Sequence, residues 1–232
     1  MKTLYKSITL FIVCILAQSN PVYAQISNVL GSMNKPLLIS EQYNKTDGSP
    51  YYNEDYLSGK IFDKEGKLKD VVLKYDTYRD EVELLMDGQV ILIAQDFYPK
   101  FVIEEVDLKL KRVVSKEFSN NYALPGQKKN KYSQVIFSND KAKILKAIQT
   151  ILIENSDTGY GGVVLNDRFD TRSFYYIVDA NNQITEIKLN TNAIISALPS
   201  EIELKQYFKK NKIKIKSEED LVELLNYFAQ KG

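Results

Sequence analysis

The sequence contains no histidine, and its single cysteine, Cys14, lies near the start of the chain. These two absences exclude whole classes of site. Zinc centres built from cysteine and histidine cannot form. Ser–His–Asp and Cys–His nucleophile systems are excluded too, because each needs an imidazole base. An enzyme made from this chain would have to use carboxylates, lysine, tyrosine, hydroxyl groups or a hard metal held by oxygen. We expect no cofactor.

Long apolar runs are also scarce. One uncharged, mostly apolar run spans residues 8–17, which is about half of the roughly 20 residues that a helix needs to cross a bilayer. Lys2 and Lys6 precede this run, and Val22-Tyr23-Ala24 supplies the small-residue pattern that a signal peptidase accepts. We therefore expect residues 1–24 to be a cleaved export signal. The protein would then be periplasmic, surface-associated or secreted, with no transmembrane anchor after cleavage.

Removal of residues 1–24 would change the chain in two ways. Cys14 would leave, so no internal disulfide could form. Its place inside the apolar run also argues against a lipid-anchored protein, in which the cysteine follows small residues at the cleavage point. Lys2 and Lys6 would leave as well, so 29 of the 31 basic residues would remain against 30 acidic ones. That balance implies no global attraction to nucleic acid or to an anionic membrane.

The rest of the sequence divides into a lead-in and one domain. Residues 25–57 are rich in Asn, Gly, Ser, Pro and Tyr, so we expect an irregular lead-in. Residues 58–232 suit a single domain with a core of ordinary size. Strands are expected to continue to about residue 188, at 58–63, 68–75, 81–86, 89–94, 101–106, 108–114, 131–137, 143–154, 173–178 and 183–188. For the segment 143–154, a helix is the alternative to a strand.

The strongest local signal is a hairpin turn at Asp87-Gly88. Both central residues of a type I′ turn need positive φ, which this pair tolerates. The opposed pairs that follow from a two-residue loop are Met86–Gln89, Leu84–Ile91 and Val82–Ile93. Directly opposed residues share a face of the sheet, so one face of the hairpin is apolar. Glu81 and Glu83 fall on the other face, which we expect to be in contact with water.

The pattern changes near residue 190. Thr191 can cap a short helix that ends before Pro199, since proline disfavours the helical conformation of the residue before it. A capping box at 200–203 begins a second helix, and Ser217 with Asp220 begins the last. Strands first and helices last predict an α+β fold. We expect antiparallel hairpins or a meander forming a sheet or open barrel, with two to three C-terminal helices, at about 191–230, packed on it.

Four stretches of the sequence form a distinctive combination. They begin at Gly48 (GSPYYNEDYLSGKIF), Leu73 (LKYDTYRDEVEL), Ser173 (SFYYIVDANNQITEIK) and Tyr207 (YFKKNKIKIKSEEDLVELLNYF). Together they resemble a group of uncharacterised secreted proteins from Bacteroidetes-type bacteria, which pair a Tyr-x-x-Tyr-x-Asp-Glu strand turn with a basic-then-acidic helical C-terminus. The resemblance implies a Gram-negative envelope setting. It implies no catalytic residue, because no activity is assigned to that group.

Two short motifs match known sites in part. Residues 157–159 (Asp-Thr-Gly) match the catalytic triplet of aspartic proteases. Those enzymes need two such aspartates, and the related stretch at 170–172 lacks the glycine. Asp179, Asn181 and Gln183 have the first spacings of a calcium loop, but other residues occupy its glycine and glutamate positions. A glycine loop and a hairpin turn are the simpler interpretations, and we expect no metal site.

A basic stretch lies near the C-terminus. Lys209, Lys210 and Lys212 form its centre, and Tyr207 and Phe208 precede them. These side chains would suit an anionic polysaccharide, lipid A phosphates or a protein partner. The alternative is structural: the lysines would complement the dipole at a helix C-terminus and then protect an edge strand by their charge.

The stretch 73–88 is the other candidate site. Four of its carboxylates, those of Asp76, Asp80, Glu81 and Glu83, lie close together in the sequence. They have the chemistry that a glycosidase needs in its paired acids. Tyr75 and Tyr78 have rings that stack on sugars, so the candidate ligand-binding residues here are Tyr75, Tyr78, Asp80 and Glu81. The alternative is a structural turn, in which aspartate is favoured because its side chain caps local amides.

The sequence thus favours an exported cell-envelope or periplasmic protein with a non-enzymatic binding or structural role. Its partner would be an envelope glycan or an envelope protein, and nucleic acid is not expected. The alternative function is a carboxylate-dependent hydrolase acting on glycans. Such an enzyme needs a concave pocket in which two acids converge.

Overall fold

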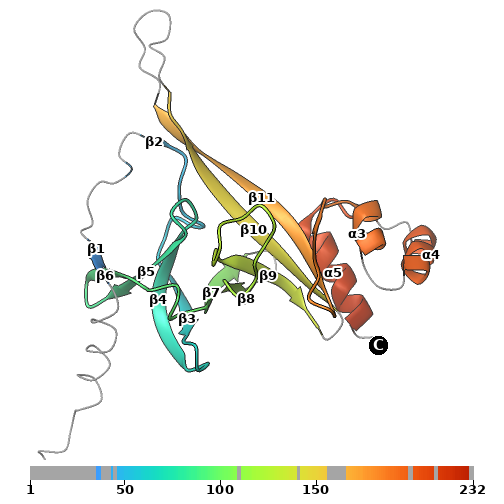
Figure 1. Ribbon diagram of the computed structural model, residues 1–232, viewed down its shortest axis with the longest axis horizontal. Helices are drawn as coiled ribbons and strands as arrows, with labels where there is room; N and C mark the ends of the chain where they lie inside the picture. Colours follow the sequence, from blue (N-terminus) through green and yellow to red (C-terminus); the bar gives the residue numbers. More distant parts are fainter. Residues whose placement is uncertain are drawn as a thin grey trace, which may run out of the picture. The chain divides into compact units, whose positions relative to one another are not determined.

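The computed structural model describes residues 35–37, 43, 46–108, 111–139, 142–155, 166–197, 201–211 and 214–229 (Figure 1). Met1–Lys35 and Pro36–Gly232 are separate units, and the described sheet and helices belong to the second, apart from the first residue of the first strand. Several predicted features lie outside the described residues: the export signal at 1–24, the triplet at 157–159, the cap at Ser200 and Lys212.

Twelve strands form one sheet in the described part of the chain. They are β1 (Lys35–Leu37), β2 (Thr46–Asp47), β3 (Leu57–Phe62), β4 (Leu68–Asp76), β5 (Glu81–Met86), β6 (Gln89–Leu92), β7 (Lys100–Asp107), β8 (Arg112–Ser119), β9 (Ser133–Ser138), β10 (Ala142–Ile153), β11 (Asp167–Asp179) and β12 (Ile184–Ile187). Three helices follow, α3 (Thr191–Ala197), α4 (Glu201–Asn211) and α5 (Glu218–Ala229). The predicted α+β class is confirmed.

The strands lie in the order β1-β6-β5-β4-β3-β7-β8-β9-β10-β11-β12, and β2 lies off this path beside β11. From β6 to β12 the neighbours on this path run antiparallel, whereas β2 runs parallel to β11. The order has two ends that do not pair with each other, so the sheet is open. Most neighbours in the sheet are neighbours in sequence, as short turns between antiparallel strands allow.

The predicted β5–β6 hairpin is confirmed in its turn and in its register. Asp87 and Gly88 have φ values of 50° and 76°, as a type I′ turn requires. Two of the predicted opposed pairs are in the register, Met86–Gln89 and Leu84–Ile91. In the third pair, the Ile93 amide donates a hydrogen bond of 3.0 Å to the Val82 carbonyl, just beyond the end of β6.

Three segments differ from the prediction. The strand expected at 108–114 begins at Arg112, because the chain turns at Lys111, where φ is 50°. The lead-in is not irregular throughout, since it contains β1, β2 and the first residue of β3. The segment at 143–154, which had a helix as its alternative, is the strand β10. It pairs with β11 from Ala142 to Ile153, and this pairing satisfies backbone groups that a helix would satisfy internally.

An aromatic core lies where β4, β7 and β8 come together. Phe101 stacks on Phe118 with ring centroids 4.7 Å apart. Tyr75 meets these two rings edge-on, at 5.2 and 5.4 Å. Tyr132, just before β9, packs against Tyr75 and Phe101. All four side chains are buried, so the end of β4 that leads into the β4–β5 turn is anchored in this aromatic cluster.

A second apolar cluster joins the helices to the sheet. Its buried members come from β10, β11, β12, the three helices and the segment before α5, and they are Ile144, Ile177, Ile187, Ile194, Ile195, Phe208, Ile215, Leu221 and Leu224. The helices therefore pack on the sheet, as predicted. The cluster also explains why Phe208 is not a surface residue of the basic stretch: its ring is buried among these aliphatic side chains.

The helix caps agree with the prediction at one end and differ at another. Asp220 donates its amide to Ser217 Oγ at 3.2 Å, and Ser217 donates its amide to Asp220 Oδ2 at 3.0 Å. This is the predicted capping box of α5. The predicted cap of α3 is wrong by one residue. Asn190 Oδ1 accepts the Ala193 amide at 3.0 Å, whereas the Thr191 hydroxyl accepts the Ile215 amide at 2.9 Å.

Candidate functional site

The acidic stretch of β4 and β5 places its side chains on two opposite faces of the sheet. The register opposes Asp76 to Glu81 and Lys74 to Glu83, so these four side chains share one face. We call it the outer face. The alternate residues Tyr75 and Val82 point to the aromatic core and are fully buried. Tyr75 is therefore a core residue, which corrects its prediction as a ligand-binding residue.

The segment before β3 runs beside the end of β4. Tyr52 donates its amide to the Tyr75 carbonyl, and Thr77 donates its amide to the Pro50 carbonyl, both at 2.8 Å. Tyr51 forms an isolated antiparallel bridge with Asp76. These backbone contacts hold the tyrosines of the segment over the outer face. The outer face is thus covered by side chains that lie far away in the sequence.

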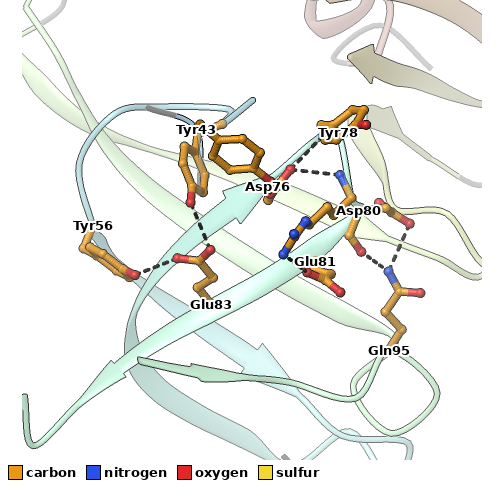
Figure 2. Close-up of polar contacts among 10 residues, drawn as sticks. Tyr43, Tyr56, Asp76, Tyr78, Asp80, Glu81, Glu83 and Gln95 are labelled. Atoms are coloured by element: carbon orange, nitrogen blue, oxygen red, sulfur yellow. Dashed lines mark hydrogen bonds and ion pairs between the residues drawn. The ribbon is translucent and has the colours of Figure 1, made fainter. Parts of the chain in front are cut away.

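Glu83 shows how complete this cover is. Its side-chain oxygens accept hydrogen bonds from Tyr51 Oη at 3.1 Å and from Tyr56 Oη at 2.6 Å, and the Tyr56 contact is visible in Figure 2. Lys74 Nζ lies 3.8 Å from the centroid of the Tyr51 ring. Glu83 is only 5% exposed. The prediction of a face in contact with water is therefore wrong for this residue.

Asp76 is engaged on both of its oxygens. Oδ1 accepts the amides of Tyr78 and Arg79 at 2.9 Å each, and Oδ2 accepts the Tyr43 hydroxyl at 2.7 Å. Burial, followed by the adjoining Asp76, raises the pKa of Tyr43. Burial and Glu83 likewise raise the pKa of Tyr51. These tyrosines therefore remain protonated donors at neutral pH.

Asp80 lies on the inner side of the turn. Its Oδ1 accepts the Tyr75 hydroxyl at 2.5 Å and the Tyr132 amide at 3.3 Å. Gln95 Nε2 donates to Oδ2 at 3.0 Å, as Figure 2 shows. Burial raises the pKa of Asp80 to about 6, against the opposing effects of the Tyr75 hydrogen bond and the Lys131 charge. Its φ of 62° also fits a turn. These contacts fasten the turn to the segment before β9.

The exposed part of the site is aromatic. Phe169 of β11 lies 5.3 Å from the ring centroids of both Tyr43 and Tyr78, and the Tyr43 and Tyr78 centroids are 6.5 Å apart. Tyr78 is 37% exposed, and the other rings are partly exposed. We define the tyrosine face as the group of partly exposed rings from these segments: Tyr43, Tyr51, Tyr56, Tyr78 and Phe169.

The remaining predicted residues fall at different places. Glu81 borders the tyrosine face and lies 3.7 Å from Arg79 in an ion pair. The Arg79 guanidinium also lies 5.7 Å from the Tyr43 ring centroid. Lys209 and Lys210 are exposed in the last turn of α4, and Lys212 lies outside the described residues. None of the polar contacts described for the tyrosine face includes these lysines.

Four members of the face were missed by the sequence analysis. Tyr43, Tyr51 and Tyr56 lie in the lead-in that was expected to be irregular, and Phe169 lies beyond the strand expected at 173–178. The density of tyrosines from 43 to 56 is a signal that could have drawn attention to the lead-in. Phe169 carries no such signal, because its contact with Tyr78 depends on how β11 meets the β4–β5 turn.

Two further features bear on the chemistry of the chain. In the part that the structure describes, no group of three or more acidic, histidine or cysteine side chains is placed to hold a metal ion. No described helix is long and apolar enough to cross a membrane.

No protein-family model matches the chain, and neither a curated protein nor a solved structure is significantly similar to it.

Proposed function

We propose that this protein is exported to the Gram-negative envelope, where it binds an envelope saccharide at the tyrosine face without transforming it. Export rests on the signal-like residues 1–24 and on the sequence resemblance described above. Saccharide binding rests on one observation: Tyr43, Tyr78 and Phe169 come from three distant segments and gather into a partly exposed aromatic surface. Aromatic faces supply large, rigid contact area for apolar surfaces such as those of sugar rings.

Charged side chains beside the rings add the polar half of such a site. Arg79 is exposed, and the partly exposed Glu81 lies beside it. Ligand sites generally combine apolar and aromatic walls with a few placed polar groups that fix orientation. A guanidinium with its fork of donors, and a carboxylate that only accepts, would together match the hydroxyl groups of a saccharide. The tyrosine face therefore has the composition of a binding site.

The carboxylates support binding better than hydrolysis. A glycosidase needs two acids that both face the scissile bond. Here Glu83 and Asp76 accept tyrosine hydroxyls, and Asp80 is buried on the inner side of the turn. Elsewhere, Asp70 and Glu104 line a hollow of about 500 Å³, but both lie within ion-pair distance of Lys60. Each of these two acids therefore already has a lysine partner.

Isothermal titration calorimetry would test the proposal. The probes are soluble glycan strands released from Gram-negative peptidoglycan and an O-polysaccharide freed of its lipid. We expect at least one to bind, and to be recovered at unchanged length after prolonged incubation. Tyr78→Ala should weaken binding about tenfold, because it removes the most exposed ring of the face and the contact area that this ring offers to a sugar. Tyr122→Ala, a partly exposed tyrosine outside the face, is the matched control. Shortened saccharide after incubation would favour the hydrolase.

A further inference from the structure

The β7–β8 hairpin extends beyond both of its neighbours in the sheet. Its two strands pair with each other from Lys100–Ser119 to Asp107–Arg112. In the described register, β3 pairs with β7 only as far as Ile103, and β9 pairs with β8 only from Glu117 onward. Residues 104–108 and 111–115 therefore form a two-stranded projection, which we call the distal arm. At about 3.4 Å per residue, its strands continue roughly 14 Å past Ile103.

The end of the distal arm is apolar and open to solvent. Val106 and Val113 oppose each other directly across the hairpin. They are 67% and 60% exposed, and Leu108 in the turn is 84% exposed. These are the three highest values among the exposed large apolar side chains that the structure describes. Single exposed aliphatic residues need no explanation. Three together on a projecting hairpin mark a contact surface.

The balance of charge differs between the base of the distal arm and its tip. At its base, the acids are neutralised: Glu104 pairs with Lys60, and Glu105 lies 2.8 Å from Lys116 Nζ. At its end, Lys111 and Arg112 are both exposed beside the apolar residues. Among the described residues of the tip, Asp107 is the one acid, and it is directly opposite Arg112 in the register. The tip therefore combines an apolar end with an excess of positive charge.

We propose that the distal arm inserts Val106, Leu108 and Val113 into the surface of a bilayer whose phosphate head groups carry a net negative charge. An apolar tip surrounded by basic side chains fits a membrane interface, where the aliphatic groups enter the acyl boundary and the cations remain at the head groups. Each lysine or arginine near an anionic surface adds about 1 kcal/mol of attraction. The tip is a narrow turn rather than a broad face, and a fluid bilayer accommodates such a shape without a complementary groove.

Membrane binding by the distal arm does not depend on saccharide binding at the tyrosine face. It is also compatible with the nearly balanced total charge of the chain. The sequence predicts no global attraction to an anionic membrane, and the arm supplies a local one. Lys111 and Arg112 act within about one Debye length of the surface, roughly 8–10 Å at physiological salt. Charges that lie more than a Debye length from the bilayer are largely screened from it by salt. The arm would thus hold the protein at a membrane surface, with the ligand-binding face on a different part of the sheet.

Sedimentation with sucrose-loaded vesicles tests the proposal on the purified protein. The vesicles are phosphatidylcholine with and without phosphatidylglycerol. We expect the parent to sediment with the anionic vesicles and far less with the neutral ones. A tip variant, V106S with L108S, should lose about tenfold or more of its binding, because it removes most of the apolar surface that enters the bilayer. Lys111→Gln should lose about fivefold on anionic vesicles and little on neutral ones.

Matched controls separate the tip from the rest of the molecule. L68S with L85S removes two exposed leucines from another part of the sheet, which are 51% and 37% exposed, and should bind like the parent. All variants carry the same N-terminus, so any signal segment contributes equally. Val113→Thr keeps the shape of the strand and should lose binding even if the double variant folds poorly. Failure of the parent to sediment with anionic vesicles, or equal binding by parent and tip variants, overturns the proposal.

Discussion

Tyr75 donates its hydroxyl to Asp80 Oδ1 at 2.5 Å, five residues further along the chain. Both side chains are buried, so the bond closes the β4–β5 turn from inside the sheet. Gln95 also donates from its side-chain amide to the backbone carbonyl of Asp80, and the Tyr132 amide donates to its carboxylate. Asp80 thereby joins the turn to two later segments, and its carboxylate is held in a site that disfavours its charge.

The first prediction concerns this buried charge. The pKa of Asp80 is about 6 in the folded protein, above the value of about 3.9 expected for an unfolded chain. Between these values the folded state holds a proton that the unfolded state lacks, so Asp80 contributes stability below about pH 4 and loses it as the pH rises to about 6. Relative to Asp80→Asn, the parent should gain about 2–3 kcal/mol in free energy of unfolding between pH 7 and pH 4.

Urea unfolding of the two proteins at pH 4, 5, 6 and 7 would measure this difference. Asp87→Asn, at an exposed aspartate in the β5–β6 turn with a similar positive φ, is the control and should not show the change with pH expected for Asp80→Asn. A parent-to-Asp80→Asn difference that is constant from pH 4 to pH 7 would show that folding does not raise the pKa of Asp80.

The second prediction concerns Glu83. On a face in contact with water, as the sequence analysis expected, Glu83→Gln would be nearly neutral, but the buried carboxylate accepts two tyrosine hydroxyls. Glutamine has one acceptor oxygen, so one hydroxyl would face an amide donor instead. We expect a loss of about 1–3 kcal/mol in stability. Glu81→Gln, which removes the charge of a partly exposed side chain paired with Arg79, should change stability by less than about 1 kcal/mol.

A double-mutant cycle with Tyr56→Phe would assign this loss to the hydrogen bond. Tyr56→Phe should cost stability in the parent and much less in the Glu83→Gln background, since the carboxylate partner is then already gone. Thermal unfolding of the four proteins is sufficient. Additive losses would mean that Glu83 and Tyr56 do not depend on each other.

The third prediction concerns Gly59 in β3. A Cβ at this position would overlap the carbonyl oxygen of Val102 and lie 2.7 Å from Leu73 Cδ2. Because the nearer of these is a backbone atom, rotation of a side chain cannot relieve the overlap. Gly59→Ala should therefore lower the free energy of unfolding by about 3 kcal/mol or more. Ser58→Ala, exposed in the same strand, should stay close to the parent in a urea titration.

The structure shows which contacts could be predicted from the sequence and which could not. The Asp87-Gly88 turn and the Ser217–Asp220 capping box depend on neighbours in sequence, and both were predicted. The burial of Glu83 depends on Tyr51 and Tyr56, which lie 32 and 27 residues away. The contact between Asp80 and Tyr132 spans 52 residues. Alternation along one strand identifies which side chains share a face, but it cannot show what covers that face.

The fourth prediction concerns export. If residues 1–24 are a cleaved signal, intact-mass measurement of the protein from the envelope or medium of an expressing Gram-negative cell should give a chain that begins at Gln25, with or without cyclisation to pyroglutamate. An otherwise intact chain that still carries Met1 in these fractions would contradict export by cleavage. Replacing Ala24 with a bulky residue should slow or shift the cleavage, because the peptidase requires small residues there.

The most direct measurement of saccharide binding at the tyrosine face is an NMR titration with isotope-labelled tyrosine rings. Peptidoglycan glycan strands, or O-polysaccharide if these do not bind, would be added to the parent protein, and the rings would be assigned by single Tyr→Phe variants. The proposed function predicts saturable shifts of Tyr43 and Tyr78, with Tyr122 and the buried Tyr132 unchanged. Saturable shifts confined to rings outside the face, or no shifts with either saccharide, would contradict it.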